Sequence, residues 1–280
     1  MSDRPNTRNM ALFCDFENVA LGVRDAKYAA FDIRKVLERL LLKGNIVVKK
    51  AYCDWERYKE FKKAMHEASF ELIEIPHVRQ SGKNSADIRM VVDALDLCYT
   101  KSHVDLFVII SGDSDFSPLV SKLRENNKTV IGVGVKSSTS DLLIANCDEF
   151  IYYDDLAREP ENQRKRRSRP AAKKSAAPRG KDGKEKEPEL PPADDKRQEA
   201  LDLVMATVED LFEERGQEEK VWASMVKQTI KRRKPGFNES YHGFRSFGQL
   251  LEEAQARHLL ELELDEKSGG YIVKSFQSEE

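Results

Sequence analysis

The sequence predicts an α/β fold with a mostly parallel sheet, followed by a smaller α+β segment. Through the first 155 residues, short apolar runs alternate with amphipathic helical stretches, which is the pattern of βαβ units. The most apolar run, 104–111, alternates poorly between apolar and polar residues, as a strand covered on both faces does. Beyond a polar stretch, helical periodicity and a Gly-Gly turn then mark a second folded segment.

Each expected element of the first segment follows from the spacing of its apolar residues. Short apolar runs predict strands, and apolar residues three and four apart predict helices. The expected strands are 11–16, 45–54, 70–78, 104–111, 128–135 and 149–155. The expected helices are 31–44, 56–69, 85–101, 116–127 and 137–147.

The C-terminal segment is expected to form a small winged-helix-like α+β domain. Three helical stretches precede two alternating runs within 259–275 that flank the Gly-Gly turn, and helices followed by a hairpin are typical of winged-helix modules. Phe244, Phe247 and Leu250 lie at helical spacing, which places them in the expected core.

These segments give three expected parts: a folded domain at 9–156, a linker at 157–196 and a second domain at 197–276. The linker has almost no large apolar residue, so it cannot bury enough surface to offset its ordering entropy, and we expect it to be disordered. Its basic stretch RKRRSRPAAKK is either a solvated tether or an aid in holding a polyanion.

Several classes of protein are disfavoured by composition. No apolar stretch approaches the roughly 20 residues of a membrane span, and the polar N-terminus lacks a signal-peptide apolar region, so a soluble cytoplasmic protein is expected. The net charge is −2. Four cysteines are scattered without metal-ligand spacing, which predicts buried free thiols. Glycine-rich phosphate motifs are missing from the sequence, which disfavours a nucleotide cofactor.

Acidic residues follow two of the expected strands at the point where each strand ends. Asp15 ends the first strand, and Asp113 and Asp115 follow the run 104–111. If these strands are neighbours, their tips lie about 5 Å apart, and ligands of parallel α/β sheets bind beyond such tips. Asp87 lies at the start of the helix 85–101 and supplies a carboxylate from a third element. Converging acids repel one another unless a cation neutralises them, and oxygen-only ligands favour Mg²⁺ or Mn²⁺.

Each acid also has a simpler structural interpretation. Asp87 could only cap its helix, a role for which Ser85 competes, and Asp113 and Asp115 could be turn residues. Asp93, six residues after Asp87, is rotated by about 240° from it and is expected to face away.

Polar and cationic neighbours complete the candidate site. Glu17 is a secondary candidate for the metal, and Asn18 is suited to orient a water or a phosphate. Arg79 and Lys83 could hold a phosphate or could be ordinary loop charges, and Lys136 is a weaker candidate of the same kind.

Four stretches together carry a resemblance to a known family. They are DFENV at 15–19, SADIRMVVDAL at 85–95, SGDSDF at 111–116 and SSTSDLLIANCDEFIYYDDL at 137–156. In this combination and order they resemble the NYN domain, the LabA-like branch of the PIN-like nucleases.

The NYN resemblance implies a three-layer α/β/α sandwich and divalent-metal-dependent cleavage of RNA by an acid cluster. Carried over to this sequence, the catalytic and metal-binding cluster falls on Asp15, Asp87, Asp113 and Asp115, with Asn18 as its polar companion.

The C-terminal segment is similar to an OST-HTH (LOTUS) domain through the stretch KPGFNESYHGFRSFGQLLEEAQ. The resemblance implies binding of RNA or of a protein partner. Lys231, Arg232, Tyr241 and Arg245 are the expected RNA contacts, because basic groups neutralise phosphates and aromatic rings stack on bases.

The favoured hypothesis is a ribonuclease that cuts RNA internally. Its tethered module captures single-stranded or structured RNA. A non-catalytic RNA-binding or regulatory adaptor is the alternative, and a phosphatase or nucleotide-binding enzyme is a third. The sequence leaves the oligomeric state open.

Overall fold

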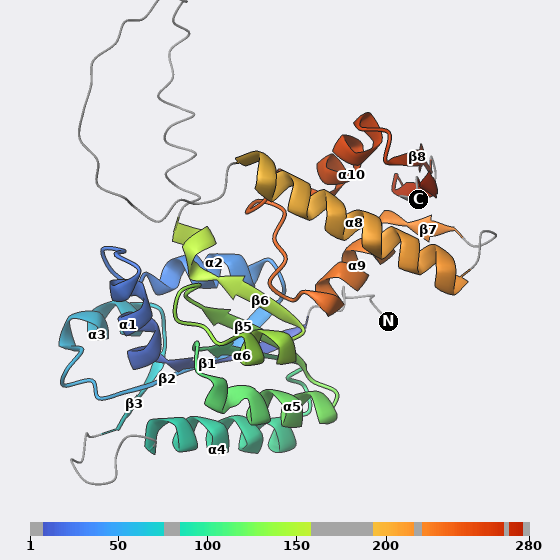
Figure 1. Ribbon diagram of the computed structural model, residues 1–280. Helices are drawn as coiled ribbons and strands as arrows, with labels where there is room; N and C mark the ends of the chain where they lie inside the picture. The colour runs from blue at the N-terminus through green and yellow to red at the C-terminus, as the bar shows by residue number, and fades with distance from the viewer. Residues whose placement is uncertain (1–7, 76–84, 158–192, 216–219, 266–268, 277–280) are drawn as a thin grey trace, which may run out of the picture. The chain divides into compact units, whose positions relative to one another are not determined.

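The structure is a computed structural model that describes residues 8–75, 85–157, 193–215, 220–265 and 269–276 (Figure 1). The chain forms two compact units. One is built on a six-stranded sheet and the other on a three-stranded sheet.

The first unit contains a six-stranded parallel sheet in the order β3-β2-β1-β4-β5-β6. The strands are β1 Asn9–Asp15, β2 Asn45–Cys53, β3 Glu71–Glu74, β4 Leu106–Ile110, β5 Thr129–Gly134 and β6 Glu149–Tyr152. The helices are α1 Phe16–Asp25, α2 Ile33–Leu41, α3 Lys59–Glu67, α4 Ser85–Thr100, α5 Ser117–Glu125 and α6 Asp141–Asn146. The predicted α/β class is confirmed, and every pairing in this sheet is parallel.

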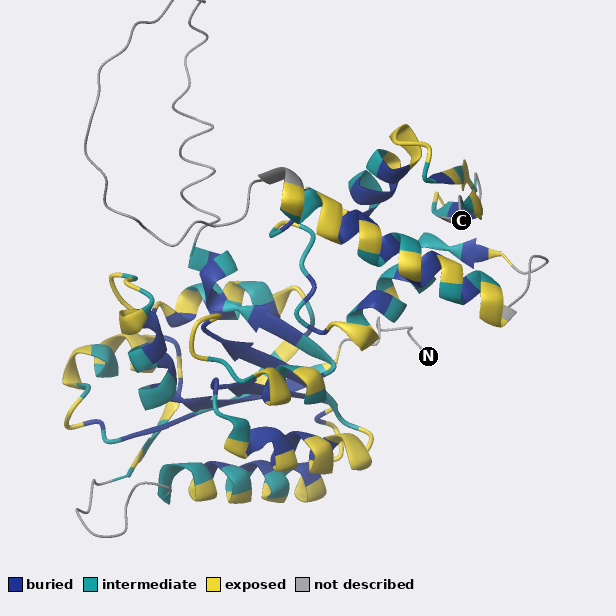
Figure 2. Cartoon of the chain, in the orientation of Figure 1, coloured by how far each residue is buried: buried dark blue, intermediate teal, exposed yellow. Residues whose placement is uncertain are grey.

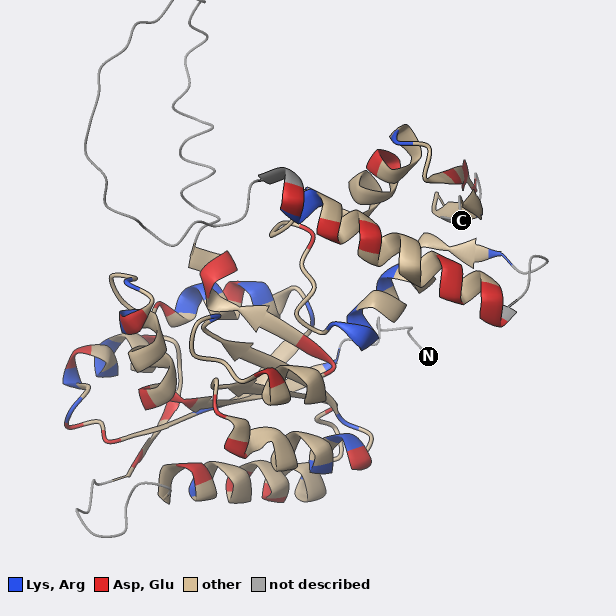
Figure 3. Cartoon of the chain, viewed as in Figure 1, with Lys and Arg blue, Asp and Glu red and all other residues tan. Residues whose placement is uncertain are grey.

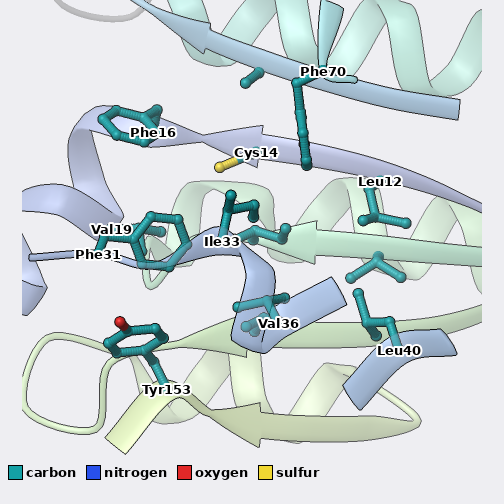
Figure 4. Packing of buried hydrophobic residues seen from close by; sticks show 14 of the residues in the cluster. Leu12, Cys14, Phe16, Val19, Phe31, Ile33, Val36, Leu40, Phe70 and Tyr153 are labelled. Atoms are coloured by element: carbon teal, nitrogen blue, oxygen red, sulfur yellow. The ribbon is translucent and has the colours of Figure 1, made fainter. Parts of the chain in front are cut away.

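Helices cover both faces of the sheet because successive side chains of each strand point to opposite sides. In β1, Leu12 and Cys14 pack into a core with α1, α2 and α3, part of which Figure 4 shows. Ala11 and Phe13 pack into a second core with α4, α5 and α6. The result is a three-layer α/β/α arrangement with β1 and β4 buried at its centre.

The first strand ends at Asp15, and helix α1 follows it without a loop. Asp15 caps this helix by accepting a hydrogen bond at Oδ1 from the backbone N of Asn18, at 3.4 Å. Phe16, Val19 and Val23 then lie on one face of the helix and are buried. We did not expect this helix, since its first residues read as a continuation of the strand.

The second unit combines helices with a small antiparallel sheet. Its helices are α8 Ala193–Arg215, α9 Ala223–Arg233 and α10 Phe247–Ala256, and its strands are β7 Val221–Trp222, β8 Leu260–Leu264 and β9 Tyr271–Phe276. The predicted hairpin is β8–β9, and β7 pairs with β9 in addition. Phe244, Phe247 and Leu250 are buried in the core, as predicted.

The expected linker can be compared with the structure only at its ends. Helix α8 already begins at Ala193, inside the range expected to be linker, and residues 158–192 lie outside the described part. Within the described ranges, no helix has both the length and the apolar character of a membrane span. All four cysteines are free and buried.

Gly132 in β5 provides a test of the packing between the sheet and the ring of Phe150 in β6. A Cβ at this position would lie 2.3 Å from two ring carbons of Phe150. We therefore expect Gly132→Ala to lower the free energy of unfolding by about 1–3 kcal/mol, as overpacking of a core does. Urea unfolding followed by the fluorescence of buried Trp55, in a Trp222→Phe background, measures the change in this unit.

A double-mutant cycle with Phe150→Leu controls for other effects of the added methyl group. The penalty of Gly132→Ala should shrink once the ring is absent. An equal penalty in both backgrounds would contradict the packing described here.

Candidate active site

The pairing of β1 with β4 brings two chain segments together at the carboxyl edge of the sheet. Cys14 is paired with Ile110, so the next residues, Asp15 and Ser111, lie side by side. Ser111 Oγ donates a hydrogen bond of 2.9 Å to Asp15 Oδ2. Both residues are buried, and Asp15 is only 8% exposed. A carboxyl group is therefore fixed in the interior at the end of the central strand.

A second hydrogen bond joins the start of α1 to the loop after β4. The backbone N of Gly112 donates to Asn18 Oδ1 at 2.9 Å. A Cβ at Gly112 would lie 2.6 Å from the backbone oxygen of Ser138, so this close approach requires glycine. Asn18, predicted to contact substrate, thus uses its side-chain oxygen to hold the loop, while the residue also lines the cavity described below.

The two acids of the SGDSDF stretch form a local turn. This turn contains the 3₁₀ helix η1 Ser114–Phe116. Asp113 N donates to Ser111 Oγ at 3.2 Å, and Asp113 Oδ1 accepts from Asp115 N at 3.0 Å. Asp113 and Asp115 are both turn residues, as the simpler interpretation of the sequence expected, and the turn fixes the backbone next to Asp15.

Three of the four predicted acids line one cavity of about 300 Å³. Asp15 comes from the end of β1, Asp113 from the loop after β4 and Asp87 from the first turn of α4. The wall also includes Glu17, Asn18, Leu21, Tyr52, Cys53, Asp54, Ile75 and Ala86. Asp115 is exposed and is not among the lining residues. Acids from three separate elements thus share one concave surface.

Burial and mutual repulsion change the protonation of these acids. Burial, then the charge of Asp87 and that of Asp113, raise the pKa of Asp15 from 3.8 to about 7, against the opposing hydrogen bonds from Ser111 and Asn18. The pKa of Asp87 is also raised, first by burial and then by Asp113, Asp115 and Glu17. Asp115 therefore acts on the site electrostatically although it does not line the cavity.

The donor atoms fit a hard divalent cation in kind, but they are not at ligand spacing. Among the described residues, no three Asp, Glu, His or Cys side chains stand close enough to hold one ion. The cavity offers carboxylate oxygens from Asp15, Asp87 and Asp113, which are the ligands that Mg²⁺ and Mn²⁺ prefer. Binding would require side-chain movement that brings these oxygens together.

Of the three predicted phosphate-binding cations, the structure describes Lys136. Arg79 and Lys83 lie outside the described residues. Lys136 Nζ lies over the ring of Tyr152, 5.7 Å from its centroid. Sequence reasoning missed Arg57, whose Nη1 donates to Glu17 Oε1 at 3.0 Å. No signal in the sequence pointed to it, because Arg57 and Glu17 are 40 positions apart.

Tyr52 in β2 is a further lining residue that sequence reasoning missed. Its hydroxyl donates to Asp93 Oδ2 at 2.9 Å, and Lys50 and Arg89 pair with the same carboxylate at 3.3 and 3.1 Å. Asp93 does not line the cavity, in agreement with its predicted rotation away from Asp87. Asp93 therefore fixes the cavity-lining Tyr52 through a hydrogen bond and does not supply a ligand to the cavity.

The RNA contacts predicted for the C-terminal segment lie in two stretches, of which the end of α9, from Lys231 on, belongs by its contacts to the first unit. Lys231 and Arg232 lie in the last turn of α9, which is strongly basic (Figure 3). Tyr241 is half-buried in the loop before α10, with Lys196 Nζ 4.7 Å from its ring centroid. Arg245 is exposed in the same loop, and its backbone N donates to Gln249 Oε1.

Comparison with known proteins gives related sequences without established activities. An uncharacterized protein of Methanocaldococcus jannaschii is 26% identical over 140 residues, 50% of this chain and 53% of that protein. The chain thus spans about half the length of this curated relative. The crystal structure of a protein of unknown function from Vibrio parahaemolyticus is 27% identical, with 55% of this chain and 98% of that chain covered and a TM-score of 0.49.

A family assignment completes the comparison. Residues 9–154, more than half of the chain, match the NYN domain family. The matched region holds the whole six-stranded sheet and every acid that lines the cavity. The chain belongs to the NYN domain family, of the PIN-like nuclease superfamily.

Proposed function

We propose that the protein is a divalent-metal-dependent ribonuclease that cuts RNA internally. The observation that carries this proposal is the shared cavity of Asp15, Asp87 and Asp113, which come from three elements far apart in the sequence. Carboxylates placed together in a partly buried cavity raise one another's pKa, and a cation would remove that repulsion. Membership of a nuclease-type family agrees with phosphodiester hydrolysis as the reaction.

Within this proposal, Asp15, Asp87 and Asp113 hold Mg²⁺ or Mn²⁺, and Asp115 adds a fourth carboxylate at the exposed edge. A bound divalent cation lowers the pKa of a water molecule and offsets the charge of the leaving oxygen. The residues of the chain position this chemistry: Ser111 and Asn18 fix Asp15 and the loop that follows β4. Burial of Asp15 keeps bulk water from that carboxyl group.

Two sets of residues, mostly cationic, would capture RNA. Arg79 and Lys83, together with Arg57 beside Glu17, are suited to hold phosphates near the acids. The C-terminal segment, proposed as an OST-HTH (LOTUS) RNA-binding module, contributes Lys231, Arg232, Tyr241 and Arg245. Connecting both units in one chain raises the local concentration of bound RNA at the catalytic unit. A protein partner of the C-terminal unit is compatible with the same resemblance.

One observation favours the alternative of a non-catalytic RNA-binding adaptor. The acids in the described ranges are not spaced as ligands of a single ion. An adaptor would retain RNA without turnover in the presence of Mn²⁺. The cleavage assay below separates the two functions.

Replacing Asp113 tests the assignment of the acids. With Mn²⁺ present, Asp113→Asn should lower the rate of RNA cleavage by about 100-fold or more, since loss of a metal-binding carboxylate removes several kcal/mol of transition-state stabilisation. End-labelled single-stranded and structured RNAs, incubated with Mn²⁺ or with EDTA, report both the rate and the internal position of the cuts.

The matched control is Asp25→Asn, an exposed acid at the end of α1 that is paired with Arg24. It should cleave like the parent protein. Parent-like cleavage by Asp113→Asn would mean that the proposed site is wrong, and binding without cleavage by the parent would favour the adaptor.

The stability of the metal-free protein should depend on Asp15 and on pH. The folded-state pKa of Asp15 is about 7 and its ordinary value is 3.8, so the folded state retains a proton that the unfolded chain releases. Stability therefore falls as pH rises through this window, and Asp15→Asn removes the effect. Between pH 5 and pH 8 the parent should lose about 2–3 kcal/mol of unfolding free energy through Asp15, and the Asp15→Asn variant should not. The variant should therefore compare with the parent about 2–3 kcal/mol better at pH 8 than at pH 5.

Urea unfolding in EDTA at both pH values measures this difference, with Asp25→Asn as the exposed control. The control should give the same small change at both pH values. An Asp15→Asn effect that is independent of pH would show that Asp15 titrates normally.

Removal of Arg232 and Arg245 tests the RNA-binding surface proposed for the C-terminal segment. Each change to Ala should weaken binding of single-stranded RNA and reduce the slope of log affinity against log salt by about 0.7, because one phosphate contact is lost. Fluorescence anisotropy across a salt series measures the slope. Lys274→Ala in β9, a lysine paired with Glu263, is the control and should leave the slope unchanged. A parent-like slope in both arginine variants would remove these residues from the proposed surface.

A further inference from the structure

Helix α4 carries an apolar stripe on the side that faces away from the sheet. Its inner side is buried through Met90, Ala94 and Cys98. At 100° per residue, the opposite side presents four apolar residues within a narrow sector, which we call the outer stripe: Ile88, Val92, Leu95 and Tyr99. Exposed residues recur along this side of α4 in Figure 2.

The outer stripe is more than a scatter of single exposed residues. Ile88, Val92 and Tyr99 are 63%, 55% and 64% exposed, and half-buried Leu95, which also packs against the core beneath α4, lies between them. Their spacing of four, three and four residues is that of the seam between two packed helices. Contiguous apolar surface of this kind marks an interaction site.

The composition of the chain disfavours its own undescribed segments as the partner. The long segment 158–192 contains a single large apolar residue, Leu190, among charged residues, prolines and alanines. The segment 76–84 contains only Val78. Neither sequence offers apolar residues at a spacing that matches a stripe of four.

The outer stripe is instead complementary to itself. Its spacing reads the same in both directions about the midpoint between Asp93 and Ala94. When two copies of α4 are laid antiparallel, Val92 of one copy meets Leu95 of the other, and Ile88 meets Tyr99. A twofold interface requires such self-matching, since each contact occurs twice.

Charges beside the stripe select the same arrangement. Arg89 follows Ile88 and Asp96 follows Leu95, so both lie on one edge of the stripe. Both are exposed, although Arg89 also pairs with Asp93 on its own helix. Antiparallel packing presents this edge of both helices on the same side of the seam and brings Arg89 of each copy near Asp96 of the other, whereas parallel packing would place the two edges on opposite sides. Figure 3 shows the acidic and basic bands along α4.

From the outer stripe and its flanking charges, we propose that α4 is a homodimer interface on which a second copy of this chain packs antiparallel. A single helix pair buries less than the roughly 1,200 Å² of a standard stable interface. The dimer is therefore expected to be weak, and its population should depend on protein concentration in the micromolar range.

Sedimentation velocity of the full chain over a concentration series tests the proposal. The parent protein should pass from monomer to dimer, and Val92→Glu should raise the dissociation constant at least tenfold. The matched control is Leu142→Glu in α6, which replaces an apolar residue of similar exposure, 57%, away from the stripe. It should dimerise like the parent, and circular dichroism checks that each variant is folded.

A charge exchange distinguishes loss of the dimer interface from loss of the folded monomer. Arg89→Asp and Asp96→Arg should each weaken the dimer, and the double variant should recover it, because the pairing across the interface is restored with reversed signs. A parent that stays monomeric throughout the series would overturn the proposal. A dimer unaffected by Val92→Glu, equally weakened by Leu142→Glu, or not recovered in the double charge variant would also overturn it.

Discussion

The parallel pairing of β1 with β4 is the constraint on which the candidate site depends. Apart from Asn9 at the start of β1, both strands are buried between two helical layers, so a shift of one residue would turn apolar side chains from one core into the other. The register that satisfies both cores sets Cys14 against Ile110, and this places Asp15 beside Ser111. Apolar packing thus fixes a buried carboxyl group to within hydrogen-bond distance of its partner.

The sequence was informative wherever a local pattern carries the structure. Apolar runs identified all six strands of the parallel sheet, and acids at the ends of two such runs pointed to Asp15 and Asp113. Asp87 was found because an acid in the first turn of a helix is visible in the sequence. Asp115 was placed with the other acids on the same grounds, but the turn around Ser114 leaves it exposed and outside the cavity wall. Alternation and position therefore predict which strand end a residue occupies, not the direction of its side chain.

The remaining features depend on residues that only the fold brings together. The hydrogen bond between Asn18 and Gly112 joins positions 94 residues apart, and the contact of Tyr52 with Asp93 joins β2 to α4. Helix α1 was missed for a related reason, since buried Phe16 continues the apolar run of β1. Its start is set by the side chain of Asp15, which caps the helix through Asn18 N. Asp15 therefore ends a strand, begins a helix and lines the cavity.

Helix α4 links the energetics of the fold to those of the site. Met90 and Ala94 anchor its inner side in the core, while its first turn carries Asp87 into the cavity. The carboxylates of the cavity raise one another's pKa, so the packing that fixes α4 also holds Asp87 close enough to act on Asp15. A second copy packed on the outer stripe would restrain the same helix from its other side. In an antiparallel pair the two Asp87 residues would lie about 20 Å apart along the seam, given a rise of 1.5 Å per residue. A cation held by Asp87 and a second copy packed on the outer stripe would then both bind to helix α4. Two binding events that favour the same position of one helix strengthen each other.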